Sequence, residues 1–208
     1  MQQWRLWHED EHLLVVEKPA GMLAVPGRGA DKQDCLGARV AAEWPDARVV
    51  HRLDMATSGL ILFARGALAQ RRLNDAFAQR LVDKRYAAVV HGHLAADEGI
   101  VDAPLAADWP NRPRQRVDAV RGRPALTRWR VLARDAALRR TRVELQPVSG
   151  RAHQLRVHMQ AVGHPIVGDA LYGDDAAREP RLLLHAMRLA FAHPHDGRPC
   201  EFASPPPF

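Results

Sequence analysis

Short apolar runs separated by turn-forming residues constrain the fold of this chain more than any other feature. Such runs are typical of buried strands, and a proline directly after one, as at Pro19, ends the strand. The predicted strands are Leu13–Val16, Leu60–Ala64, Tyr86–Val90, Val131–Ala133, Thr141–Leu145 and Leu182–Phe191. Strands interspersed with few helices predict an α+β fold, with a mostly antiparallel central sheet and flanking helices.

Three segments have the apolar spacing of amphipathic helices. Asp34 is predicted to cap the first of them, and Pro45 lies just beyond its end. The predicted helices are 34–44, 67–81 with Leu73, Ala76, Phe77 and Leu81 on one face, and 151–162 with Leu155, Met159 and Val162 on one face. Residues 94–124 are rich in turn formers and have no long helical pattern. Without repeats or a low-complexity linker, residues 1–208 are expected to form a single domain.

The composition is ordinary for a globular protein, with 47% hydrophobic and 26% charged residues. No stretch approaches the roughly 20 apolar residues that a membrane span needs. Residues 1–9 lack a basic region followed by an apolar run, so we expect no secretory signal. Cys35 and Cys200 are the only cysteines and have neither metal-ligand spacing nor the pattern of a disulfide framework. We therefore expect a cytoplasmic protein.

Basic charge is concentrated in one part of the chain. The net charge is +6, and 27 of the 30 basic residues are arginines. A basic excess favours a polyanionic partner, although a GC-rich genome also raises the arginine content. In residues 108–130, seven arginines face only two acids, and Trp109 and Trp129 flank the stretch. Arginine forks beside aromatic rings suit phosphates and unstacked bases, so this stretch is predicted to bind nucleic acid; a solvated basic loop is the other interpretation.

One segment, His51–Leu60, combines residues suited to catalysis. It places Asp54 two residues after Arg52, in a turn-like stretch that leads into an apolar run. A carboxylate acts as a nucleophile when it stays ionised in a partly dry pocket, and a nearby guanidinium favours the ionised form. The other interpretation, common for an isolated Arg-x-Asp, is an ion pair that fixes a loop.

Two further segments carry candidate functional residues. Tyr86 enters a strand in Lys84-Arg85-Tyr86, where a tyrosine is usually a core residue with its hydroxyl at the surface. Gly150–His158 contains two arginines, which could simply form a solvated basic face. Its two histidines lie five residues apart, which does not place both on one helix face, so we expect no metal site.

Together these segments resemble the motifs of the RluA family of RNA pseudouridine synthases. The last one is similar to the family's Gly-Arg-x-His-Gln-Leu-Arg-x-His motif. The resemblance implies that Asp54 is the catalytic carboxylate, that Tyr86 lies against the target base and that Arg156 pairs with Asp54. It also implies that Leu155 packs on the tyrosine and that Arg52 fills the space left by a flipped base. The residues expected to contact RNA are His51, Arg52, Arg151, His153, Leu155, Trp109, Arg112, Arg114 and Arg116.

The resemblance runs nearly end to end. Glu17–Met22 is similar to the family's N-terminal motif, and Asp108–Pro113 and Pro180–Ala186 are similar to the branch that acts on both 23S rRNA and tRNA. The family motif begins by residue 17, which leaves no room for the S4 RNA-binding module that many relatives carry before it. The family fold implies an antiparallel sheet with an active-site cleft along it.

The function implied by the resemblance is isomerisation of uridine to pseudouridine. The implied targets are U746 of 23S rRNA and U32 of tRNA anticodon loops. No phosphate-binding glycine motif is present, and we expect no cofactor. A monomer is expected, since no heptads or spare amphipathic helix appear. The alternatives are a synthase with one substrate, a non-catalytic RNA-binding or ribosome-assembly protein on the same fold, and a base-excising glycosylase.

Overall fold

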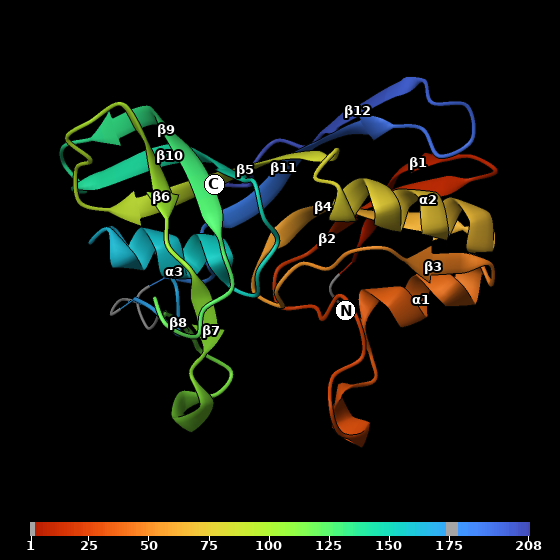
Figure 1. The fold of residues 1–208 in the computed structure, drawn as a ribbon, viewed down its shortest axis with the longest axis horizontal. Coiled ribbons are helices and arrows are strands. Elements are labelled where there is room, and N and C mark those ends of the chain that lie inside the picture. The colour runs from red at the N-terminus through yellow and green to blue at the C-terminus, as the bar shows by residue number, and fades with distance from the viewer. Residues whose placement is uncertain (1–2, 174–178) are drawn as a thin grey trace. The chain divides into compact units, whose positions relative to one another are not determined.

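The computed structural model describes residues 3–173 and 179–208, and these divide into two compact units (Figure 1). The first unit comprises Met1–Lys84 and His185–Pro207, and the second comprises Arg85–Leu184 with Phe208. Residues 1 and 2 of the segment considered for a secretory signal lie outside the described part. No helix among the described residues is long and apolar enough to cross a membrane.

Strand β4 (Ser58–Arg65) is the centre of the first unit. It pairs antiparallel with β2 and β3 and parallel with β11, while β1 extends β2 and β12 extends β11. Leu60 and Leu62 of β4 are buried against Leu73 of the helix α2. The other elements are β1 (Arg5–Glu9), β2 (Leu13–Lys18), η1 (Ala30–Lys32), α1 (Leu36–Glu43), β3 (Ala47–Val49), α2 (Gly66–Ala78), β11 (Leu184–Ala192) and β12 (Pro199–Ala203).

The second unit is an antiparallel sheet in the order β5-β10-β9-β6, accompanied by one helix and a separate hairpin. Inward side chains alternate along β10, where Thr141, Val143 and Leu145 are buried and their neighbours are only partly covered. The elements are β5 (Asp83–His91), β6 (Glu98–Asp102), β7 (Leu105–Ala107), η2 (Trp109–Asn111), β8 (Gln115–Val117), β9 (Leu126–Asp135), β10 (Arg140–Pro147) and α3 (Gln154–Ala161). Strands β7 and β8 form the hairpin, and η2 lies at its tip (Figure 1).

The predicted α+β class with mostly antiparallel strands is confirmed, as are the six predicted strands and the three predicted helices. The predicted cap of the first helix is wrong. Cys35 occupies the N-cap, and its Sγ accepts a hydrogen bond from the amide of Ala38. Asp34 instead accepts two hydrogen bonds from the guanidinium of Arg39 at 2.7 Å each. The prediction of a single domain stays a prediction.

The predicted apolar face of the second helix is also partly wrong. Helix α2 ends at Ala78, and Arg80 has a left-handed backbone with φ of 61°. Leu81 therefore lies beyond the helix and is 65% exposed. Val162 likewise lies beyond the end of α3 and is 39% exposed.

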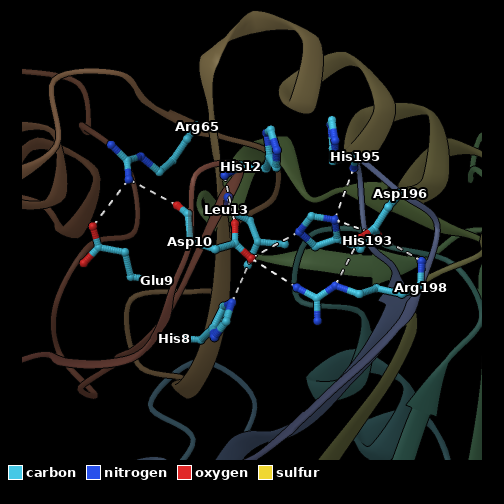
Figure 2. Close-up of polar contacts among 10 residues, drawn as sticks. All are labelled: His8, Glu9, Asp10, His12, Leu13, Arg65, His193, His195, Asp196 and Arg198. Atoms are coloured by element: carbon cyan, nitrogen blue, oxygen red, sulfur yellow. Dashed lines mark hydrogen bonds and ion pairs between the residues drawn. The ribbon is translucent and has the colours of Figure 1, made fainter.

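A polar cluster around Asp10 fastens two turns of the first unit to each other (Figure 2). One carboxylate oxygen of Asp10 accepts from the amides of His12 and Leu13, which closes the β1–β2 turn. The other lies 2.9 Å from Nε2 of His8 and 3.1 Å from Nε2 of His193, in the turn between β11 and β12. Burial would raise the pKa of the Asp10 carboxyl, but these hydrogen bonds outweigh burial and hold the pKa well below its usual value.

Candidate active site and nucleic-acid interface

Asp54 lies in the loop between β3 and β4, where a turn presents its carboxylate. The amide of Thr57 donates to the carbonyl of Asp54 at 3.1 Å and closes this turn. Asp54 is half-buried and Arg52 is exposed. The loop thus carries a partly covered carboxylate and, two residues before it, an arginine that water or a ligand can reach.

His51 anchors the entry to this loop. Its Nε2 accepts a hydrogen bond of 2.9 Å from the amide of Leu62, and its ring stacks on Phe77 with centroids 4.6 Å apart. Burial, aided by the nearby charge of Lys84, lowers the pKa of His51 to about 3. The imidazole is therefore neutral near pH 7 and acts as an acceptor that fixes the backbone. The RNA contact predicted for His51 stays a prediction.

Lys18 ties the Asp54 loop to the segment that follows β2. Its side chain is completely buried, and Nζ donates to the carbonyls of Pro19, Met22 and Met55 at 2.8, 2.8 and 3.0 Å. The Met55 carbonyl also accepts from the amide of Gly21 at 2.8 Å. A buried ammonium surrounded by carbonyls is a charge-assisted anchor, and here it holds the residue directly after Asp54.

The exit from the loop is fixed by a close approach between β4 and β11. Gly59 has φ of +114°, and a Cβ there would lie 2.3 Å from the carbonyl oxygen of Ala186. Only glycine fits this position. Beside it, the hydroxyl of Ser58 lies 2.8 Å from Nδ1 of the buried His185. The loop that carries Asp54 is thus held at both ends by the core of the first unit.

In the second unit, Gly150–His158 forms the start of α3, and two of its side chains attach it to β9. Gln154 is buried, and its amide nitrogen donates to the carbonyl of Leu126 and to Oγ1 of Thr127. Its amide oxygen accepts from Ser149 and from the amide of Arg151. Nδ1 of the buried His158 lies 2.9 Å from the same Thr127 hydroxyl, and burial lowers the pKa of His158. These two motif residues are structural.

Arg156 is buried in α3 and is held by an acid that lies outside the motif. Its Nε and Nη2 donate to the two carboxylate oxygens of the fully buried Asp169 at 2.7 and 2.6 Å. Its guanidinium also lies over the ring of Tyr172, with 5.0 Å between Cζ and the ring centroid. Such a bidentate, stacked arrangement fixes the plane of an arginine side chain.

The other predicted residues of this unit lie at two places. Tyr86 is half-buried in β5, opposite Leu145 of β10. Leu155 is buried in α3, and its contact with Tyr86 stays a prediction. Arg151, before α3, donates through Nε to the carbonyl of Pro124 at 3.1 Å. His153 has a left-handed backbone with φ of 53°, and its Nδ1 lies 2.8 Å from the hydroxyl of Tyr172.

The β7–β8 hairpin carries the predicted nucleic-acid-binding residues. Trp109 at its tip is 67% exposed, and the guanidinium of Arg112 stacks on the indole 3.2 Å from the ring centroid. Arg114 lies over the ring of Tyr172, and Arg116 pairs with Asp118 at 2.9 Å. Trp109 thus remains largely exposed although a guanidinium stacks on its ring. Such a stacked pair on a basic hairpin is a suitable surface for a base and its phosphate.

The structure therefore groups the predicted residues in two sets. Arg52, His51 and Asp54 share one loop of the first unit, while Tyr86, Leu155, Arg156 and the basic hairpin belong to the second. Asp54 and Arg156 thus belong to different units, and their predicted pairing stays a prediction. No group of three or more histidine, cysteine, aspartate or glutamate side chains that could hold a metal occurs in the described part of the chain.

Three residues that make several hydrogen bonds around the predicted site residues were not assigned from the sequence: Lys18, Asp169 and Tyr172. Lys18 lies in the N-terminal motif that was recognised, but its acceptors are backbone carbonyls, which a sequence does not reveal. Asp169 and Tyr172 lie beyond the last recognised helix. A partial signal was available in Gly168, since glycine often marks a turn with a left-handed backbone, and Gly168 has φ of 75°.

Comparison with known proteins identifies the family of this chain. The family model described as RNA pseudouridylate synthase matches residues 12–161. The chain is 49% identical over 197 residues to the dual-specificity RNA pseudouridine synthase RluA of Yersinia pestis, covering 94% of this chain and 95% of that protein. It is 48% identical over 203 residues to the protein of the same name from Escherichia coli K12, covering 97% and 92%.

Solved structures give the same result for the fold. Human RNA pseudouridylate synthase domain containing 1 superposes with a TM-score of 0.82 at 29% identity, covering 99% of this chain and 84% of that one. Human RNA pseudouridylate synthase domain containing 4 gives a TM-score of 0.78 at 24% identity, covering 98% and 88%. The second similarity concerns the fold alone.

Proposed function

We propose, from the premise that this chain belongs to the RNA pseudouridylate synthase family, that it modifies uridines in two RNA hairpins, one in 23S rRNA and one in tRNA. Membership makes the chain an RNA pseudouridine synthase, which is an isomerase. The observation that carries the proposal of two substrates is the similarity of about half of all positions, over nearly the full length, to relatives named as dual-specificity enzymes. The proposed targets are U746 of 23S rRNA and U32 of tRNA.

The proposed catalytic residues are Asp54, Tyr86 and Arg156. The reaction breaks the bond between C1′ and N1, turns the freed uracil and joins C1′ to C5, whose hydrogen leaves as a proton while N1 gains one. Asp54 acts on the sugar or on the base, and both routes require it to be ionised. Arg156 keeps it ionised, and Tyr86 stacks on the uracil and takes part in proton transfer at C5.

The target base has to leave its stack before these groups can reach it. Flipping a nucleotide costs a few kcal/mol, and filling the space that it leaves recovers part of that cost. Arg52 is proposed to fill this space, because it is exposed and lies two residues before Asp54 in the same fixed loop. None of the proposed reaction steps requires a cofactor.

RNA binding is proposed to involve the basic hairpin and the start of α3. Trp109 and Arg112 offer a stacking surface for a base, and Arg114 and Arg116, which follow in the same hairpin, supply positive charge for phosphates. His51, Arg151, His153 and Leu155 are proposed to complete the RNA contacts. We further propose a monomer that works in the cytoplasm, where both RNAs occur, without a membrane partner.

The test is the release of tritium from C5 of uridine in two separate RNAs, a tRNA anticodon hairpin and a 23S rRNA hairpin. Each hairpin has a matched control in which the target uridine alone is replaced by cytidine. We expect release from both target hairpins and from neither control. Release from one hairpin only would reduce the proposal to a single substrate, and release from neither would refute the proposed targets.

A further inference from the structure

We propose that Asp169 and Tyr172 are positioning residues that hold Arg156 and join it to the basic β7–β8 hairpin. The inference rests on the proposed role of Arg156 beside the catalytic carboxylate. Both residues lie in the turn after α3, in Gly168–Gly173, and all the groups involved belong to the second unit.

Asp169 is built into the structure as a fixed acceptor. It is completely buried, and one of its carboxylate oxygens accepts from the amides of Leu171 and Tyr172 at 2.9 and 3.1 Å. Gly168 has φ of +75°, and a Cβ there would lie 2.1 Å from the carbonyl oxygen of Arg181. Contacts that do not involve Arg156 thus fix the backbone around Asp169.

That carboxylate determines how the guanidinium of Arg156 is oriented. The pair uses Nε and Nη2, so Asp169 occupies one edge of the planar group, and Tyr172 covers one face. Neither hydrogen bond to Asp169 involves Nη1. A guanidinium held in this way presents its charge at one place and does not sample other rotamers.

Tyr172 connects this arrangement to the hairpin. Its hydroxyl accepts from the amide of Gln115, the first residue of β8, at 2.7 Å, and lies 2.8 Å from Nδ1 of His153. Its ring is 96% buried and lies under both Arg156 and Arg114. One side chain therefore joins the loop end of the hairpin, where Gln115 pairs with Ala107, to the start of α3 and to the arginine of the motif. RNA bound on the hairpin is thereby held in a defined position relative to Arg156.

The two residues should affect different kinetic constants. Asp169→Asn removes the negative charge and one of the two acceptors that hold the Arg156 guanidinium. We therefore expect kcat to fall on the order of 10- to 100-fold, while KM changes less than about 3-fold. Tyr172→Phe keeps the ring under Arg156 but releases Gln115. It should raise KM for RNA by about 3- to 10-fold, the effect of one hydrogen bond, with little change in kcat. Asp135→Asn, at an exposed position of the same unit, should match the wild type.

A double-variant cycle with Arg156→Met separates positioning from folding. Replacing both members of a buried pair avoids an unpaired buried charge, so the double variant is expected to fold even where Asp169→Asn does not. In single-turnover assays, Asp169→Asn should lower the rate no further when Arg156 is already methionine. A further loss as large as in the wild-type background would overturn the proposal, because Asp169 would then act through something other than Arg156.

Other outcomes are equally decisive. Wild-type kcat for Asp169→Asn would overturn the claim that Asp169 positions Arg156. Wild-type KM for Tyr172→Phe would overturn the claim that Tyr172 connects Arg156 to the hairpin. If Arg156→Met itself keeps wild-type kcat, the proposed catalytic role of Arg156 fails, whatever the result for Asp169→Asn. If Arg156 is required and Asp169→Asn is silent, the proposed function stands and only this inference fails.

Discussion

Substitution of Lys18 by methionine tests how the Asp54 loop is held. Methionine has a similar volume, so the change removes the charge and three hydrogen bonds but leaves little space empty. The carbonyls of Pro19, Met22 and Met55 lose a charged donor, and each buried acceptor left unsatisfied costs about 1–3 kcal/mol. Burial of the extra apolar surface and removal of a desolvated ammonium offset part of this cost. We expect the free energy of unfolding to fall by about 2–4 kcal/mol.

The same substitution should lower turnover, because Met55 directly follows Asp54. Displacing a catalytic group by about 1 Å costs on the order of 100-fold in rate, so kcat at saturating RNA should fall by about 10- to 100-fold. Urea denaturation gives the first quantity, and tritium release below the unfolding transition gives the second. Lys32→Met, at an exposed lysine, is the matched control. A Lys18→Met protein whose stability stays within about 0.5 kcal/mol of the wild type and whose kcat is unchanged would refute the reasoning.

Three further predictions concern stability. Gly59→Ala should lower the free energy of unfolding by more than about 2 kcal/mol in urea denaturation, whereas Gly66→Ala should lower it by about 1 kcal/mol. Gly66 also has a positive φ, of +75°, but a Cβ there would meet no atom within 4 Å, so equal effects would contradict the close approach at Gly59. Because the pKa of Asp10 lies below its ordinary value of 3.8, the ionised carboxylate stabilises the fold above that pH. Asp10→Asn should therefore lower the free energy of unfolding by about 1–2 kcal/mol at pH 7, and progressively less below pH 3.8. Because the pKa of His51 is lowered from 6.5 to about 3, the free energy of unfolding should fall as the pH drops from 6.5 towards 3, and less steeply in His51→Gln. Identical pH profiles of the two proteins would argue against a neutral imidazole at this position.

Much of the fold could be predicted because burial is visible in the sequence. β4 is buried along nearly its whole length, and its run of apolar residues identifies it directly. The short strands β7 and β8 could not be found in this way. They have three residues each and include arginine and glutamine, and they exist because they pair with each other and because Tyr172 binds the amide of Gln115. Tertiary contacts, rather than local propensity, determine such strands.

The candidate site was predictable to the extent that its residues lie in contiguous motifs. Asp54 and Arg156 could be identified from their segments, but the bond between Arg156 and Asp169 spans 13 residues and joins a helix to a turn, so no periodic pattern reveals it. Gln154 and His158 lie in the same motif as Arg156 and had no structural role assigned from the sequence, yet the structure shows both bound to Thr127. A motif therefore contains residues that build the site as well as residues that act in it.

The measurement that tests the central claim most directly compares Asp54→Asn with the wild type for tritium release from both hairpins, together with RNA affinity. Asp31→Asn, at an exposed aspartate of the same unit, is the matched control. We expect Asp54→Asn to release no tritium from either hairpin while its affinity for RNA stays within a few fold of the wild type, and Asp31→Asn to behave as the wild type does. Substantial release by Asp54→Asn would contradict the assignment of Asp54 as the catalytic carboxylate.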